Sequence, residues 1–368
     1  VRLLHAAALV EMGRYAEAEA ELARPSLAGD PEAMLWRGLA ALGLGDHAKA
    51  AQLLRRGENV LVHYPPLYQG SFRLAMVDAH LGQGNLASAK TALELIDPTH
   101  LNPTQQIEFT WRQAQLDLRS GDRLGARPKI ERVAASDHRP LAARARFTLI
   151  EEQLAAAQID RAKAIEGMDR LRLAWRGDDF EPTLLRHIGS LLVEEGKWRD
   201  GMDAWRQAAT LFAKTPQAKQ ITDDLARAFE TLFLAGAADD LPPIEALGIY
   251  YDFRELTPTG AKGDEMIRRL ADRLAAMDLL EQAGDLIEHQ VNFRLKGEAR
   301  ARLAIRLAIL RLLDRQPEKA LKALEATAGL PLPAEQMLER KLVEARALGE
   351  LGRYEQARKA LADESAPG

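Results

Sequence analysis

Histidine is the residue type in this chain best suited to holding a metal ion or moving a proton near neutral pH. The chain has eight, spread over its length: His5, His47, His63, His80, His100, His138, His187 and His289. A zinc site on one helix needs two histidines four residues apart, as in H-E-x-x-H, because that spacing puts both rings on one face. No two histidines here have that spacing. We therefore expect them in turns, on the surface or partly buried, and we expect no metal site.

Residues 43–48 have the form G-x-G-x-x-A, the glycine pattern that places a pyrophosphate against a helix N-terminus. That chemistry requires a β-strand before the glycines, whereas a helical pattern precedes Gly43. The same slot recurs along the chain as a turn between helical stretches, so we interpret it as a hairpin turn and expect no cofactor. The sequence also lacks a G-x-S-x-G motif and a P-loop.

Two pairs of adjacent carboxylates, Asp178–Asp179 and Asp239–Asp240, have the residue types of a general acid and base. Both pairs precede predicted helices, where aspartate commonly caps the N-terminus, and we expect that role for them. The chain has no cysteine, which excludes disulfides, thiolate zinc sites and cysteine nucleophiles. These patterns together predict a protein that is not an enzyme.

Composition narrows the class of protein further. Of the 368 residues, 47% are hydrophobic and only 5% aromatic, so the core must be built mainly from alanine and leucine. The formal net charge of -4 argues against binding to nucleic-acid phosphates. No apolar run approaches the roughly 20 residues needed to span a bilayer.

Compartment and source are indicated only by composition. The absence of cysteine favours a bacterial periplasm over the cytoplasm. The many alanines and arginines are typical of a high-GC bacterium. The chain begins with Val1 rather than Met, so we expect it to be a piece of a longer or processed protein.

The elements that position these residues repeat along the chain. Residues 183–212 predict two amphipathic helices joined by a turn at Gly196, with a small residue about five positions after the turn and a large apolar residue four later. The same arrangement recurs with a period of about 37 residues. The turns fall at or near Gly13, Gly45, Gly84, Gly121, Gln158, Gly196, Asp278, Arg315 and Gly352. The interval between Gly196 and Asp278 is double, which predicts one divergent hairpin with helices over 216–235 and 243–254.

This spacing resembles the tetratricopeptide repeat (TPR) family, whose pattern is W-x2-L-G-x2-Y followed by A-x3-F. Here it becomes Leu185-x2-Ile188-Gly189-x2-Leu192 and Gly201-x3-Trp205. Ala50-x3-Leu54 and Ala357-x3-Leu361 repeat the second half of the pattern. The resemblance implies an all-α fold, a right-handed α-solenoid of about ten antiparallel helix hairpins, with a concave surface lined mainly by first helices. It also implies a binding role without catalysis.

We expect three segments. Residues 1–236 form an N-terminal array of about six hairpins plus the start of the divergent one. Residues 237–263 form a divergent junction that contains aromatic residues. Residues 264–368 form a C-terminal array of about three hairpins.

The family geometry predicts a partner-binding site on the concave face. Its candidate residues lie in the predicted first helices: Trp111, Arg112, Gln115, Arg119, Glu152, Arg186, His187 and Ser190. Tryptophan flanked by arginine is typical of interface anchors. The alternative for Trp111 is packing between helices as part of the core. The lysine and asparagine positions of the family's carboxylate clamp are not present, so recognition of an acidic tail has no support.

A second candidate surface lies later in the chain. Residues 294–311 are basic and amphipathic, with Arg302 and Arg306 on one face, and either bind an acidic partner or anionic lipid or form a solvated helix face. Tyr250, Tyr251 and Phe253 either plug an irregular junction or belong to a partner-docking or hinge element.

The sequence thus predicts a non-enzymatic scaffold that binds a peptide or helix of another protein in a concave groove. The alternative is a self-associating structural component of a larger assembly, for example in a bacterial envelope. Apolar residues near both ends, such as Leu39 and Ile309, either pack against neighbouring repeats or mediate such self-association.

Overall fold

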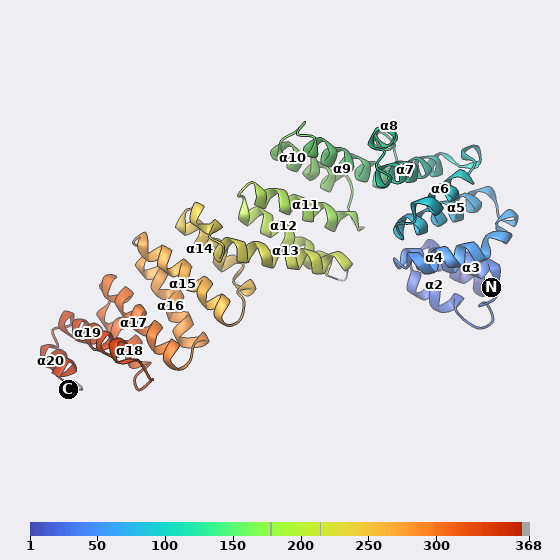
Figure 1. Cartoon of the computed structure of the whole chain (residues 1–368). Helices are drawn as coiled ribbons and strands as arrows, with labels where there is room; N and C mark the ends of the chain where they lie inside the picture. Colours follow the sequence, from blue (N-terminus) through green and yellow to red (C-terminus); the bar gives the residue numbers. More distant parts are fainter. Residues whose placement is uncertain (177–178, 214, 363–368) are drawn as a thin grey trace. The chain divides into compact units, whose positions relative to one another are not determined.

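A computed structural model describes residues 1–176, 179–213 and 215–362. Over these residues the chain forms twenty α-helices, a few short 3₁₀ or π-helical turns and no β-strand, as the helical periodicity predicted (Figure 1). Asp178 and the last six residues of the predicted C-terminal array lie outside the described part of the chain. The chain divides into two compact units, Val1–Leu191 and Leu192–Gly368.

The first unit is built from antiparallel helix pairs. Its first helices are α1 (Arg2–Glu11), α3 (Pro31–Gly43), α5 (Pro66–Gly82), α7 (Pro103–Arg119), α9 (Arg139–Ala155) and α11 (Phe180–Glu194), which runs past the unit boundary. Its second helices are α2 (Tyr15–Leu22), α4 (His47–Gly57), α6 (Leu86–Glu94), α8 (Arg123–Ala134) and α10 (Arg161–Ala174). Two 3₁₀ segments, η1 (Glu58–His63) and η2 (Pro98–His100), lie between pairs.

The second unit contains α12 (Trp198–Leu211) and three regular pairs. These pairs are α15 (Ala261–Ala276) with α16 (Leu280–His289), α17 (Gly297–Leu313) with α18 (Pro317–Glu325), and α19 (Ala334–Glu350) with α20 (Tyr354–Ala362). Between α12 and α15 lie α13 (Pro216–Phe233), η3 (Ala237–Asp240), α14 (Pro243–Asp252) and η4 (Arg254–Leu256). A π-helical turn, η5 (Gln290–Arg294), follows α16.

A residue with left-handed backbone makes the turn inside each pair. The predicted turn glycines all have positive φ, for example 72° at Gly13 and 85° at Gly121. Glycine adopts this conformation without the clash that a Cβ causes. Three pairs use other residues, Ala157, Asp278 and Arg315, with φ between 53° and 61°. The predicted spacing of the turns is therefore kept in these three pairs, although their turn residue is not glycine.

The divergent hairpin has the same kind of turn. Gly236, with φ of 93°, follows α13 about midway between Gly196 and Asp278. The predicted helices over 216–235 and 243–254 correspond to α13 and α14. The two helices contact each other through aromatic side chains. The ring centroid of Tyr250 on α14 lies 6.1 Å from that of Phe229 and 5.7 Å from that of Phe233, both on α13.

The recurring small and large residues of the second helices form the core. The small residue is fully buried in most pairs, and the large residue four positions later is buried beside it, as in Ala18 with Leu22 and Ala126 with Ile130. Gly38 on α3 lies so close to Leu54 on α4 that an added Cβ would be 2.6 Å from the leucine Cγ. Small residues thus let paired helices approach closely.

Helix starts follow ordinary capping chemistry. The Asp30 carboxylate accepts the backbone N–H of Glu32 at 3.0 Å ahead of α3. Asn102 and Gln105 form a reciprocal capping box at the start of α7. Proline occupies the first turn of both helices, where its missing N–H is not needed.

The structure shows where two of the sequence motifs lie, the glycine pattern and the carboxylate pairs. Residues 43–48 cover the end of α3, a turn and the start of α4, where the Asp46 carboxylate accepts the Lys49 N–H, so the glycine pattern is a hairpin turn. The capping role expected for the carboxylate pairs is wrong for Asp239–Asp240, because both lie within η3 and α14 begins after Pro242 without a side-chain cap. Asp179 directly precedes α11 and forms an ion pair with Arg144 at 2.6 Å.

The predicted junction 237–263 lies inside the second unit rather than between the two units. Contiguous helix pairing continues through it, because α13, η3 and α14 pack on one another. The boundary between the compact units falls at Leu191–Leu192, within α11. Composition does not mark this position, since it is an ordinary apolar stretch of a repeat.

Candidate partner-binding site

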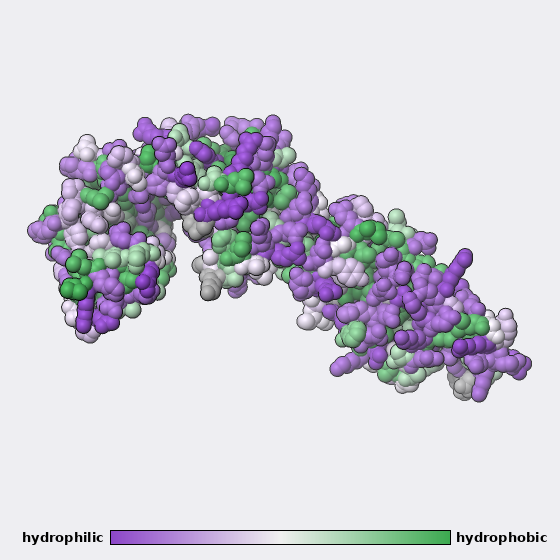
Figure 2. Space-filling model, turned by 180° about the vertical axis from the view of Figure 1, so that it is seen from behind, coloured by the Kyte–Doolittle hydropathy of each residue, from purple (hydrophilic) through white to green (hydrophobic). Residues whose placement is uncertain are grey.

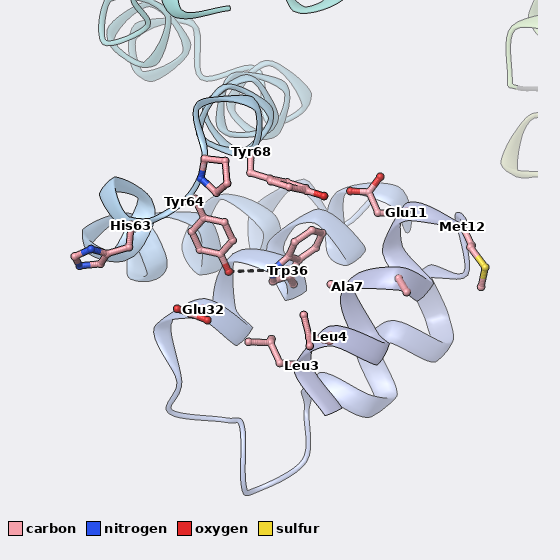
Figure 3. A pocket seen from close by; sticks show the side chains of 12 residues that line it. Leu3, Leu4, Ala7, Glu11, Met12, Glu32, Trp36, His63, Tyr64 and Tyr68 are labelled. Carbon is pink, nitrogen blue, oxygen red and sulfur yellow. Dashed lines mark hydrogen bonds between the residues drawn. The ribbon is translucent and has the colours of Figure 1, made fainter. Parts of the chain in front are cut away.

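An open apolar pocket of about 680 Å³ lies among the first helices of the first unit. Its walls come from α1, from α3 and from the junction of η1 with α5 (Figure 3). The residues that line it are Leu3, Leu4, Ala7, Ala8, Glu11, Met12, Glu32, Trp36, His63, Tyr64, Pro65 and Tyr68. Successive first helices build it, which is the arrangement that the sequence predicted for a binding surface.

An aromatic cluster forms one wall. Trp36 donates its indole N–H to the Tyr64 hydroxyl at 3.1 Å, which fixes both rings. Tyr68 packs edge-on against Trp36 with centroids 5.7 Å apart, and Phe72 packs behind them at 5.3 Å. Burial raises the pKa of the Tyr64 phenol, and the nearby carboxylate of Glu32 adds to the rise. The wall is therefore rigid and neutral.

Helix α1 forms the opposite wall. Leu3, Leu4 and Ala7 lie on the side of α1 that faces Trp36 and Tyr64 (Figure 3). The Leu4 side chain is 75% exposed and Met12 is also largely exposed. A leucine exposed next to a tryptophan and two tyrosines is a feature of surfaces that bind other molecules rather than of solvated faces.

The face of the molecule drawn in Figure 2 is more hydrophilic than the lining of this pocket. Figure 2 shows a face that is mostly hydrophilic, with apolar patches that are small and separated. Among the residues that the structure describes, no group of three or more histidine or acidic side chains is placed to hold a metal ion. None of the described helices combines the length and apolar character that crossing a bilayer requires. The lining of the pocket is mainly apolar.

The architecture is defined by paired helices with in-phase left-handed turns and a buried small-x3-large pattern. The fold is a TPR-like helical repeat. Solved TPR structures are found by structural comparison, among them the TPR domain of P58(IPK), with 15% identity over 96% of this chain and 98% of that one, at a TM-score of 0.28. Yeast Tom70 gives 15% identity, 99% and 97% coverage and a TM-score of 0.23.

A signal transduction ATPase with a tetratricopeptide repeat sensor from Pyrococcus horikoshii gives 14% identity, 94% and 55% coverage and a TM-score of 0.36. TM-scores this low support no further argument. The TPR-like assignment is based on the helices and turns of this chain itself. No family model matches the chain, and no curated protein matches its sequence.

Trp111, the predicted anchor of the groove, lies in the TPR-like core. Its side chain is 9% exposed and packs with Ala114, Ala126 and Ile130 between α7 and α8. This is the core packing that the sequence left open as the alternative. Trp111 therefore offers little surface to a partner.

Its neighbours on α7 tie that helix to α5. Arg112 makes a paired contact with Asp78, with one nitrogen-to-oxygen distance of 2.5 Å and the other of 2.8 Å. Burial lowers the pKa of Arg112, but the carboxylate of Asp78 outweighs this and leaves the pKa raised. Arg119 donates to the backbone oxygen of Leu81, and Gln115 is half-buried. Arg112 and Arg119 thus hold α7 against α5.

One predicted residue of α11, His187, makes a similar contact with α9. His187 on α11 lies 3.0 Å from the Glu151 carboxylate on α9 and also contacts the backbone oxygen of Thr183 at 2.8 Å. The hydrogen bond to Glu151 raises the pKa of His187. Glu152, Arg186 and Ser190 are half-buried on the same two helices. The candidates therefore lie on three first helices, and a contact between α9 and α11 joins His187 to Glu151, which the sequence did not single out.

The second candidate surface separates into buried and exposed parts. Phe253 is 0% exposed and Tyr250 is buried, as in a junction plug, whereas Tyr251 is 44% exposed. Tyr251 lines a pocket of about 700 Å³ whose other residues include Arg254, Asp285 and Arg294. This pocket mixes both charges and is less apolar than the one at α1.

Arg302 and Arg306 are both exposed on α17 and both are paired. Arg302 contacts Glu298 and Gln336, and Arg306 contacts Asp272. Their charges are therefore balanced by acidic and polar neighbours of the same unit. This is the solvated face that the sequence left open as one of two interpretations.

Sequence reasoning missed the aromatic pocket at α1, α3 and α5. Its signal was present, because Tyr64, Tyr68 and Phe72 follow one another at four-residue intervals in a chain with few aromatics. On a helix that spacing places side chains on one face; Tyr68 and Phe72 do lie on α5, and Tyr64 precedes the helix by two residues. Trp36 lay outside the pattern, since only the fold brings α3 against this face.

Proposed function

We propose that this chain is a non-enzymatic scaffold that receives a peptide or helix of another protein on the surface formed by its first helices. The observation that carries the proposal is the open pocket among α1, α3 and α5, with Leu4, Trp36 and Tyr68 on facing walls. Its volume of about 680 Å³ falls within the roughly 300–1,000 Å³ of ordinary ligand pockets. Rigid aromatic side chains bind with little loss of conformational entropy and are enriched among interface hot spots.

The proposed surface continues along α7, α9 and α11. Gln115, Arg119, Glu152, Arg186, His187 and Ser190 supply its polar part. Trp111 and Arg112 are excluded from direct contact in this proposal, because the first is in the core and the side chain of the second is only 14% exposed beside Asp78. The polar part would orient a bound segment, and the apolar pocket would supply most of the affinity.

Leucine substitutions test the proposal without disturbing the core. Leu4→Asp places a charge in the pocket at a position that is 75% exposed, and Leu124→Asp makes the same change on α8 at a position that is 90% exposed. Affinity capture from a lysate of the source organism should recover a protein with the unmodified chain and with Leu124→Asp, and lose it with Leu4→Asp.

Capture that is equal for all three forms would remove the pocket from the binding surface. Recovery of this chain alone, abolished by Leu4→Asp, would favour the self-associating alternative. Circular dichroism of the three forms should be the same, since neither leucine is buried.

A further inference from the structure

The charge around the apolar pocket points to the chemistry of its occupant. Two of the twelve lining residues, Glu11 and Glu32, carry negative charge, and neither lysine nor arginine lines the pocket. Glu11 lies at the end of α1 and Glu32 in the first turn of α3, so the two carboxylates stand on opposite sides of the mouth (Figure 3).

These two carboxylates have no ion-pair partner within the described part of the chain, unlike the acids next to them. Glu17 pairs with Arg14, Glu21 with Arg24, and Glu19 with both Arg37 and Lys49. The acids of α2 are thus balanced by basic side chains, whereas the two acids at the mouth of the pocket are not. Unpaired acids beside an apolar wall repel an acidic occupant and attract a basic one.

The aromatic wall favours the same sign of charge. Tyr68 is partly exposed, and Figure 3 shows the hydroxyl end of its side chain pointing toward Glu11, so the ring lies close to that carboxylate. The face of a tyrosine ring attracts an ammonium or guanidinium group, and a carboxylate beside the ring strengthens that attraction. The long aliphatic part of lysine or arginine can also cover apolar surface while its charged end remains in water.

We propose that the pocket binds a segment of another protein in which a large apolar side chain stands close to a lysine or arginine. The apolar side chain enters between Leu4 and Trp36, and the cation lies at the mouth, near Glu11 and the ring of Tyr68. This inference rests on the proposed function and adds the chemistry of the partner.

A random library of twelve-residue peptides displayed on phage, selected on the full chain, tests this proposal. The selected peptides should combine a large apolar residue with a nearby lysine or arginine. A fluorescent synthetic copy of the most enriched peptide should bind more weakly as the salt concentration rises. Its affinity should fall about tenfold or more for the double variant Glu11→Lys/Glu32→Lys, because two attractions become repulsions.

Matched variants separate the charge from the pocket. Glu94→Lys changes an exposed, unpaired carboxylate on α6 and should leave the affinity unchanged. Leu4→Asp should abolish binding, and Leu124→Asp should not affect it.

The outcomes distinguish the two proposals. Peptides that require Leu4 but are acidic or neutral, or that ignore the Glu11→Lys/Glu32→Lys change, would overturn the basic occupant and keep the peptide pocket. Peptides whose binding is indifferent to Leu4→Asp would overturn the proposed function itself. Concentration-dependent self-association that is lost in Leu4→Asp would make a second copy the occupant and overturn both.

Discussion

Arg112 and Asp78 show how a single ion pair joins two first helices. The Arg112 side chain is largely enclosed, and its contacts are the Asp78 carboxylate, the backbone oxygen of Glu108 and the Glu108 carboxylate at 3.6 Å. A guanidinium in this position cannot return to water when its main partner is removed. The pair therefore acts through the cost of leaving a charge unpaired rather than through strong attraction.

We predict that Asp78→Ala lowers the free energy of unfolding by about 1–3 kcal/mol, because Arg112 then lacks its principal acceptor. Urea denaturation followed by circular dichroism measures the change. Glu17→Gln breaks the exposed pair with Arg14 and should have no measurable effect. Equal losses for the two variants would contradict the enclosed role of Arg112.

His187 gives the first unit a predictable pH dependence. Its pKa is raised in the folded chain by the hydrogen bond to Glu151, while the unfolded chain has the ordinary value of about 6.5. The stabilisation is therefore fully present below about pH 6.5 and is lost as the pH rises through the folded pKa.

We predict that His187→Gln costs more stability at about pH 5.5 than at about pH 8.5, because only the protonated imidazole gains from the Glu151 carboxylate. Thermal or urea unfolding of both forms at the two pH values measures the difference. A cost that is larger at the higher pH would show that the neutral ring is the favoured form.

At the scale of elements, the turn inside each helix pair is the feature that repeats most faithfully. Ala157 occupies this position in the fifth pair with φ of 53°, where Gly121 has 85° in the fourth. A left-handed backbone costs an alanine about 1 kcal/mol or more relative to glycine.

We predict that Ala157→Gly stabilises the chain and that Gly121→Ala destabilises it, each by about 1 kcal/mol. An added Cβ at Gly121 would meet no atom within 4 Å, so the loss would come from the backbone alone. The shift of the urea midpoint measures both. Destabilisation by Ala157→Gly would mean that chain entropy outweighs turn strain.

The close approach of α3 and α4 leads to a second prediction at this scale. Gly38→Ala should destabilise by about 1–3 kcal/mol, since the new methyl group would press on Leu54. Gly349→Ala, in α19, should stabilise by up to about 1 kcal/mol, because its Cβ meets nothing within 4 Å and alanine is the better helix former. Calorimetry of both variants measures the contrast. Similar effects at the two glycines would contradict the packing role of Gly38.

Much at this scale could be predicted from the sequence. The period, the turns and the buried residues of the second helices follow from local spacing, which depends on residues close in the chain. The turn at Gly236 could not be placed beforehand because the residues after it form a 3₁₀ segment instead of the usual second helix. Capping by Asp239–Asp240 failed for the same reason.

At the scale of the whole molecule, the site was harder to predict than the fold. Family geometry predicts which helices line the binding surface, and the pocket does lie among first helices. Family geometry does not predict which side chains on those helices are exposed and which are engaged within the fold. Trp111 and Arg112 have the residue types of an interface anchor, but the packing of α8 and the position of Asp78 engage them within the fold. Those contacts depend on residues far apart in the sequence.

Both compact units are helical repeats, yet the apolar pocket belongs to the first and the mixed-charge pocket at Tyr251 to the second. The formal net charge of -4, which is summed over the whole chain, does not show this difference between the two pockets. Under the proposed function, we expect a partner of the first unit to contribute an apolar side chain to this pocket.

The most direct test of the central claim is site-specific photo-crosslinking in the source organism. A benzophenone amino acid at position 4 and, as control, at position 124 would report what lies against each exposed leucine. We predict a discrete adduct with another protein at position 4, mapping to one segment of that protein, and none at position 124. The same adducts at both positions, or none at position 4, would contradict a binding role for the pocket of α1, α3 and α5.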